Sequence, residues 1–281
     1  MRILVTGKKG QLASEIHKIS SISEDIEWIF SDKIYFDLLN LEKIKPKLDK
    51  ISPGIIVNCA AYTSVVKSEK DFVSANTVNN KAVVLIAKWC KTNKCKLIHI
   101  SSDYVYDENS KKPIKEDYHT NPVNNYGKSK LLGEIGCLKY NPESIIIRTS
   151  WLYSSFGNNF VKKVISLISR GKDLKIINDQ IGSPTYALDL ARVIISIITF
   201  KKWIPGVYNY SNKGEVSWFD FAKDILAIYG IKNIHIIPKS SEDANLNFKR
   251  PKYTVLDNSK IKKTFDLNQL DYKFRLKECI K

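Results

Sequence analysis

Tyr126 and Lys130 stand four residues apart in the segment Asn-Asn-Tyr-Gly-Lys-Ser-Lys. If this segment is helical, residues at positions i and i+4 share one face, so the phenol and the ammonium project toward the same point. A nearby ammonium favours the phenolate and lowers the pKa of the tyrosine, which helps the phenol to donate a proton to an alkoxide near neutral pH. The pair therefore predicts an enzyme acting on a carbonyl or hydroxyl group, and a solvated helix face is the alternative.

A glycine turn near the start of the chain offers a nucleotide site. Gly7 and Gly10 follow an expected strand and precede an expected helix, a setting in which backbone amides approach a pyrophosphate at the helix N-terminus. Lys9 replaces the middle glycine of the Gly-x-Gly-x-x-Gly pattern, and Ala13 takes its last small position. The turn predicts dinucleotide binding through a looser fingerprint, with an ordinary strand-to-helix turn as the alternative.

The end of the second expected strand bears on the choice of cofactor. Asp32 and Lys33 should lie beside the adenosine ribose, where a carboxylate favours the 2′-hydroxyl of NAD and a cation favours the 2′-phosphate of NADP. Both types occur together, so NADPH and NADH both stay open. Asp37 is a candidate for the adenine side, and each of these residues has a solvated loop position as its alternative.

The next two strands end in further candidate residues. The segment from Asn58 to Lys67 begins with small residues, which allow close backbone approach to a dinucleotide at the carboxyl end of the sheet. A hydroxyl at the end of the fourth strand, Ser101 or Ser102, can hydrogen-bond a substrate carbonyl oxygen as negative charge develops on it. His99, in the middle of an apolar strand, is expected to be a core residue.

The elements that position these residues follow from hydrophobic periodicity. Short β-branched runs alternate with longer amphipathic stretches, as is typical of βαβ units around a parallel sheet. The expected strands are Arg2–Thr6, Glu27–Ser31, Gly54–Asn58, Lys96–Ser101 and Ser144–Thr149, with helices after Gly10, Asp71, Asn125 and Asn158. We predict an α/β protein with a Rossmann-like doubly wound parallel sheet over residues 1–150. A smaller C-terminal substrate-binding lobe is expected over residues 151–281, from which about 187–200 returns to pack on the sheet.

Composition excludes several classes of protein. The chain has 281 residues, of which 43% are hydrophobic and 26% charged, and no stretch is long and apolar enough to cross a bilayer. The net charge of +16 comes from lysines spread along the chain, so no nucleic-acid partner is predicted. The five cysteines are scattered and suggest neither disulfides nor zinc. The N-terminus reads as a strand without a signal peptide, so the expected compartment is the cytoplasm.

Together these segments resemble the extended short-chain dehydrogenase/reductases, and within them the dTDP-4-dehydrorhamnose reductase family. The resemblance runs nearly end to end. It is carried by Gly7-x-x-Gly-Gln-Leu12, Asn58-x-Ala-Ala-Tyr-Thr63, Ser101-Ser-Asp-Tyr-Val105, Tyr126-x-x-x-Lys130, Arg148-Thr-Ser-Trp-x-Tyr153, Asn158-Asn-Phe160, Asp179-Gln-x-Gly-x-Pro-Thr185, Ser217-Trp218 and Arg250-Pro251. The blocks that begin at Arg148 and Asp179 separate this family from sugar epimerases.

The resemblance implies an activity and a set of site residues. Hydride would pass from NADPH or NADH to C4 of a dTDP-linked keto sugar, dTDP-4-dehydro-L-rhamnose, to give dTDP-L-rhamnose. The implied catalytic residues are Ser102, Tyr126 and Lys130. Together with the turn and ribose residues named above, the cofactor-binding set is Gly7, Gly10, Gln11, Leu12, Asp32, Lys33, Asp37, Leu38, Ala61, Tyr62, Thr63, Tyr126 and Lys130. The substrate-binding set is Val65, Lys67, Ser102, Asp103, Tyr104, Trp151, Asn159 and Arg250, although Trp151 also suits a core position.

Two positions depart from the family pattern. Ser102 stands where threonine is usual, which keeps the hydroxyl but constrains it less. Val66 stands where an acidic residue is usual, and this leaves the substrate and the stereochemistry open. No metal ligands are assigned, although the family can hold Mg²⁺ at a dimer contact and Glu15 matches one such position. A homodimer is therefore a further expectation.

Two other functions fit the same scaffold. One is an epimerase or dehydratase of nucleotide-sugars with tightly held NAD. The other is a non-catalytic regulatory subunit that binds a dinucleotide, which would not need Tyr126, Lys130 and the Ser102 hydroxyl.

Overall fold

A six-stranded parallel sheet forms the centre of the computed structural model, which describes residues 1–20, 26–107, 110–170, 173–231, 234–244 and 248–280. The strand order is β10-β5-β4-β3-β1-β2, and every pairing is parallel. The strands are β1 (Arg2–Thr6), β2 (Glu27–Ser31), β3 (Ile55–Asn58), β4 (Lys96–Ser102), β5 (Ile145–Thr149) and β10 (Gly206–Asn209). The five strands expected from the sequence are confirmed to within one residue at each end, and β10 is an addition.

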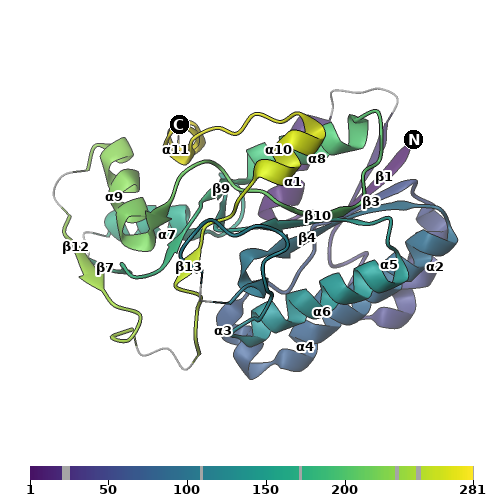
Figure 1. Cartoon of the computed structure of the whole chain (residues 1–281), viewed down its shortest axis with the longest axis horizontal. Coiled ribbons are helices and arrows are strands. Elements are labelled where there is room, and N and C mark those ends of the chain that lie inside the picture. Colours follow the sequence, from purple (N-terminus) through teal and green to yellow (C-terminus); the bar gives the residue numbers. More distant parts are fainter. Residues whose placement is uncertain (21–25, 108–109, 171–172, 232–233, 245–247, 281) are drawn as a thin grey trace.

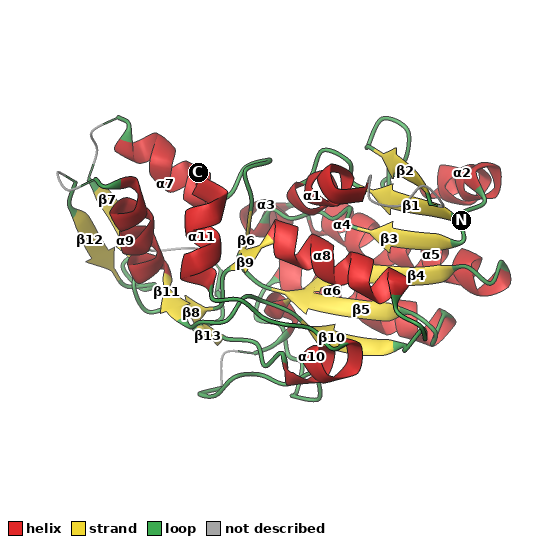
Figure 2. Cartoon of the chain, turned by 90° about the horizontal axis from the view of Figure 1, so that it is seen from above, coloured by secondary structure: helices red, strands yellow, loops and turns green. Residues whose placement is uncertain are grey.

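Helices cover both faces of this sheet, which confirms the predicted Rossmann-like α/β fold (Figure 2). One face packs on α1 (Gln11–Ile19), α8 (Ala187–Thr199) and α10 (Ser259–Phe265), and the other on α2 (Ile44–Ile51), α5 (Ala82–Thr92) and α6 (Asn125–Tyr140). Successive strand residues point to opposite faces, so Ile3 and Val5 enter the first core while Leu4 enters the second. The sheet is thereby apolar on both sides, and its strands are fixed in place.

Short helices and turns connect these layers. They are η2 (Leu41–Lys43), α3 (Val65–Lys70), α4 (Phe72–Asn76), the π-helical segment η3 (Thr77–Lys81) and η4 (Asp103–Val105). The Asn124 side chain accepts the N–H of Gly127 at 2.9 Å and so fixes the start of α6. The helix expected after Asn158 begins at Phe160, because Asn159 is its N-cap.

Most of the chain beyond β5 forms small sheets and helices beside the main sheet (Figure 1). The strands are β6 (Leu152–Tyr153), β7 (Leu174–Ile177), β8 (Ile181–Gly182), β9 (Thr185–Tyr186), β11 (Val216–Ser217), β12 (Ile236–Lys239) and β13 (Tyr253–Thr254). The helices are α7 (Phe160–Ile168), α9 (Trp218–Tyr229) and α11 (Tyr272–Ile280). They share a third core in which the Phe221 ring is fully buried. None of the helices in the described ranges is long and apolar enough to span a membrane.

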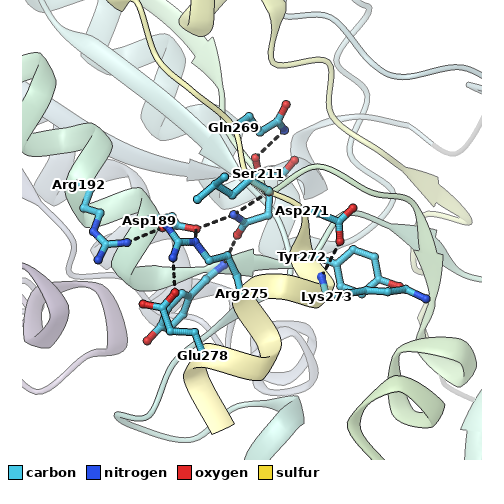
Figure 3. A network of polar contacts seen from close by, with 12 residues as sticks. Asp189, Arg192, Ser211, Gln269, Asp271, Tyr272, Lys273, Arg275 and Glu278 are labelled. Carbon is cyan, nitrogen blue, oxygen red and sulfur yellow. Dashed lines mark hydrogen bonds and ion pairs between the residues drawn. The ribbon is translucent and has the colours of Figure 1, made fainter. Parts of the chain in front are cut away.

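A polar network ties the C-terminal helix α11 to α8, which packs against α1 (Figure 3). The buried carboxylate of Asp189 lies 2.8 Å from Nε of Arg275 and 3.1 Å from Nη1 of Arg192. It also accepts a hydrogen bond of 2.7 Å from the side chain of Asn212. Charges this well paired favour one arrangement of the two helices, since an unpaired buried carboxylate is costly.

Candidate active site

The structure brings Ser102, Tyr126 and Lys130 together at the carboxyl edge of the sheet. Ser102 is the last residue of β4, and the other two residues lie on α6. The side chain of Ser102 lies close enough to Tyr126 to act on the pKa of its phenol. The Tyr126 ring also meets the Tyr104 ring edge-on, with centroids 5.5 Å apart. Lys130 lies one turn further along α6 and donates to the carbonyl oxygen of Ile100 at 2.7 Å.

Ser102, rather than Ser101, offers its hydroxyl to the site. Oγ of Ser102 donates to Oδ1 of Asp103 at 3.0 Å and accepts the N–H of Tyr104 at 3.2 Å. The Ser101 hydroxyl is buried and has no hydrogen-bond partner within the described part of the chain. Burial raises the pKa of Asp103 to about 7, against the lowering influence of the Thr254 and Ser102 side chains. The geometry favours Ser102 over Ser101, and the role of its hydroxyl stays a prediction.

The pKa of Tyr126 differs from the sequence expectation. Burial raises it to about 12, although the nearby side chain of Ser102 acts in the opposite direction. The predicted lowering by Lys130 is wrong for this structure, because loss of hydration around the phenol outweighs nearby favourable contacts. The phenol is therefore protonated at neutral pH and suits a proton donor.

A row of hydrogen bonds lies under the active-site edge of the sheet. The Thr6 hydroxyl donates to Oδ1 of Asn58 at 2.7 Å and accepts the N–H of Ala60 at 3.0 Å. Nδ2 of Asn58 lies 3.1 Å from Nδ1 of His99. Burial lowers the pKa of His99 well below its usual value, so this ring is neutral. His99 is a core residue, as its apolar strand predicted.

The glycine turn has the shape and the free donors that a pyrophosphate needs. Gly7 has a φ of +76°, and a Cβ there would lie 3.1 Å from the backbone of Ala60. Gly10, the N-cap of α1, supplies no side-chain cap, so the first N–H groups of Gln11 and Leu12 remain available to an anion. The residues present therefore fit a dinucleotide whose phosphates lie at the N-terminus of α1.

The loop after β3 is fixed by Asn79, which sequence reasoning missed. Oδ1 of Asn79 accepts the N–H of Tyr62 at 2.8 Å, and its Nδ2 donates to the Tyr62 carbonyl at 3.1 Å and to Ser129 at 2.9 Å. Asn79 lies in the π-helical segment η3, and such segments are frequent at functional sites. The candidate cofactor residues Ala61, Tyr62 and Thr63 thus lie on a segment joined directly to α6.

The residues after β2 are only partly available to a cofactor. Oδ1 of Asp32 accepts the N–H groups of Ile34 and Tyr35, and its Oδ2 lies 3.6 Å from Nζ of Lys9. These contacts, led by the hydrogen bond from Tyr35, lower the pKa of Asp32. Lys33 is exposed, and Asp37 caps its own turn through the N–H of Leu39. The Leu38 side chain is buried in the core, so only its backbone can face a cofactor.

The candidate substrate residues come from four segments. Val65 and Lys67 lie on α3, Asp103 and Tyr104 on η4, Trp151 and Asn159 follow β5, and Arg250 precedes β13. Burial raises the pKa of Tyr104, and the positive charge of Arg250 opposes this rise. Nε of Arg250 is buried without a hydrogen-bond partner in the described ranges. This open donor suits an anionic group of a substrate.

Two of these residues make structural contacts as well. The Trp151 ring stacks on Trp218 with centroids 3.4 Å apart, and a Cβ on Gly182 would lie 2.6 Å from it. Trp151 also has a φ of +46°, which is unusual for a bulky residue. Asn159 caps α7 and donates to Oε1 of Gln11 at 3.0 Å. Asn159 therefore links α1, the helix after the glycine turn, to α7.

No metal site emerges from the described ranges. They contain no group of three or more His, Cys, Asp and Glu side chains that could hold an ion. Glu15, which matched a magnesium position, is buried, and its Oε1 accepts the Ser154 hydroxyl at 2.6 Å.

The glycine turn before α1 and the pair of Tyr126 and Lys130 on α6 lie at the same edge of the parallel sheet. The serine at the end of β4 completes a set suited to proton transfer at a carbonyl. The fold and this geometry define an extended short-chain dehydrogenase/reductase.

Comparison with known proteins narrows this class. Residues 1–281 match the family described as RmlD substrate binding domain. The chain belongs to this family, which comprises NAD(P)H-dependent dTDP-sugar reductases.

Three relatives illustrate the similarity. A dTDP-4-dehydrorhamnose reductase of Aggregatibacter actinomycetemcomitans is 34% identical over 98% of this chain and 97% of its own. A dTDP-4-keto-6-deoxy-D-glucose reductase of Streptomyces niveus is 32% identical over 91% and 88%. The crystal structure of dTDP-4-dehydrorhamnose reductase from Bacillus anthracis in complex with NADP superposes with a TM-score of 0.94, at 32% identity over 99% and 98%.

Proposed function

We propose that this enzyme reduces the C4 keto group of dTDP-4-dehydro-L-rhamnose to give dTDP-L-rhamnose. The observation that carries the proposal is the placing of the Ser102 side chain beside Tyr126, with Lys130 one turn further along α6, in a chain of this reductase family. The proposed substrate is a nucleotide-sugar, and Arg250 offers a cation to its phosphates.

Each catalytic side chain has a distinct proposed role. Bound NADPH or NADH supplies the hydride. Ser102 hydrogen-bonds the carbonyl oxygen, and Tyr126 delivers the proton to that oxygen as negative charge develops. Lys130 holds the nicotinamide ribose and stabilises the phenolate that Tyr126 becomes. The pKa of Tyr126, about 12, keeps the proton in place until the alkoxide forms.

The chain is proposed to divide into a dinucleotide-binding part, 1–150, and a mainly substrate-binding part, 151–281. The segment 187–200 belongs with the first part, because α8 packs against α1 in the same core. A homodimer, a magnesium ion at its contact and a cytoplasmic location stay predictions.

We expect NADPH to be preferred over NADH. Two backbone N–H groups engage Oδ1 of Asp32, and the exposed ammonium of Lys9 lies 3.6 Å from Oδ2, too far for a hydrogen bond, so Lys9 can turn with Lys33 to a 2′-phosphate. Lys9→Ala should raise KM for NADPH roughly 10- to 100-fold, since a hydrogen bond to a charged group contributes about 1.5–3 kcal/mol. KM for NADH should change little, and initial rates at 340 nm with each cofactor measure both. An equal loss with both cofactors would contradict this assignment.

The proposed reaction is tested by NAD(P)H oxidation at 340 nm with enzymatically prepared dTDP-4-dehydro-L-rhamnose and product identification by mass spectrometry. Turnover to dTDP-L-rhamnose is the expected result. Turnover only with another 4-keto-6-deoxy sugar nucleotide would reassign the substrate, for which Val66 is the first residue to examine. Protein that purifies with NAD bound would favour an epimerase or dehydratase, and cofactor binding without any turnover would favour a regulatory subunit.

A further inference from the structure

Helix α6 carries a buried acid one turn beyond Lys130. Glu134 follows Lys130 by four residues, so the two side chains project from the same face of the helix. Only 2% of Glu134 and 1% of Lys130 are exposed. Charges at such buried positions are costly unless each has a partner, so Glu134 and Lys130 both need groups that stabilise their charges.

Arg148, on the adjacent strand β5, fixes the carboxylate of Glu134. Nε of Arg148 lies 3.0 Å from Oε1 of Glu134, and its Nη2 lies 2.6 Å from Oε2. Nη1 of Arg148 donates to the Tyr106 hydroxyl at 2.8 Å and to the Glu116 carbonyl at 3.1 Å. Because the guanidinium is held on both sides, the carboxylate has one well-defined position.

Glu134 is the source of negative charge that acts on Lys130. Burial lowers the pKa of Lys130 to about 8, and the charge of Glu134 opposes this change. Cys59 and Cys137 also lie within reach, but burial raises both of their pKa values, so they are neutral thiols at physiological pH. His99 on β4 faces Lys130 and is neutral, because burial lowers its pKa. Among the described residues that act on Lys130, only Glu134 is then an anion.

We propose that Glu134 is a positioning residue that maintains Lys130 as an ammonium, and that Arg148 fixes Glu134 in the place where it does so. The inference rests on the role of Lys130 in the proposed function, in which the ammonium holds the nicotinamide ribose. If the ion pair of Glu134 and Arg148 served stability alone, apolar residues could take its place, because well-packed apolar residues often replace buried ion pairs without loss of stability. Its position one helical turn from Lys130 points to an action on that ammonium.

The first test measures the ionisation of Lys130 in the whole protein. With ¹³Cε-labelled lysine, the NMR signal absent from Lys130→Arg identifies Lys130, and its shift is followed against pH. The wild type should titrate near pH 8. Glu134→Gln should titrate lower by about one pH unit or more, because loss of a neighbouring anion disfavours the ammonium. Glu143→Gln, the same change at an exposed site beyond the end of α6, is the matched control. An unchanged titration of Lys130 in Glu134→Gln overturns the proposal.

Two further variants separate charge from folding. Glu134→Gln leaves Arg148 buried without its anion, which can prevent folding. The double variant Glu134→Gln/Arg148→Gln removes both charges and keeps two amides that can hydrogen-bond, and it should show the same downward shift for Lys130. Glu134→Asp retains the anion and should titrate between the wild type and Glu134→Gln. A folded double variant with the wild-type titration overturns the proposal.

Turnover supplies an independent readout. The alkaline limb of kcat/KM should move to lower pH in Glu134→Gln by the amount seen for Lys130, and Glu143→Gln should keep the wild-type profile. If the wild type turns over no keto-sugar nucleotide, the proposed function fails while the NMR titration still decides the role of Glu134. If turnover is present but its pH profile does not move, Glu134 does not act through Lys130.

Discussion

Replacement of Tyr126 by phenylalanine is expected to lower kcat by about 10²–10⁴-fold, the usual contribution of a positioned proton donor. The change removes only the hydroxyl, so the edge-on contact of the ring with Tyr104 remains. The change also leaves intact the glycine turn and the hydrogen bonds of Asn79 to Tyr62 and Ser129. The dissociation constant for NADPH should therefore stay close to that of the wild type.

The experiment pairs steady-state kinetics with a fluorescence titration of NADPH. Tyr229→Phe is the matched control, because Tyr229 is partly exposed at the end of α9, away from the β4 edge. Its kinetic constants should match the wild type. Near wild-type kcat in Tyr126→Phe would show that another group delivers the proton.

Gly127→Ala is expected to destabilise the fold by about 3 kcal/mol and to lower kcat as well. A Cβ at Gly127 would lie 2.0 Å from the carbonyl oxygen of Tyr104 and 2.9 Å from Cβ of Pro122. The obstructing oxygen is backbone, so it cannot turn away as a flexible side chain would. Relief requires α6 to move away from η4, and that motion separates Tyr126 from Ser102.

Urea unfolding and kcat measured on the same preparations test this expectation. Gly54→Ala is the control, since a Cβ there would meet the Arg2 carbonyl at an ordinary 3.7 Å. The control should lose little stability and keep its activity. If Gly127→Ala has the stability and kcat of the control, the close approach of α6 and η4 is not required.

Several site residues could be predicted because their signals are local. The strand before Gly7 and the turn after it depend on side-chain alternation and on the conformations that glycine permits. The spacing of Tyr126 and Lys130 places them on one face of any helix. The parallel sheet then brings Ser102 to the same edge, because all of its strands end there.

Other features could not be predicted because they join distant segments. Asn79 binds Tyr62 and Ser129, seventeen residues before it and fifty after it. No local pattern marks that asparagine among its neighbours in η3. Glu134 is a partial exception, since its spacing from Lys130 follows the helical period, but its partner Arg148 lies on a separate strand.

The α/β alternation, the glycine turn and the spacing of Tyr126 and Lys130 can be predicted from local sequence alone, because they depend on backbone sterics and on the period of helices and strands. How those groups ionise depends on the folded chain. Tyr126 illustrates the difference: the ammonium four residues away predicted a lowered pKa, while packing buries the phenol and raises it to about 12. Loss of hydration depends on every segment that packs around a group, and those segments come together only when the whole chain has folded.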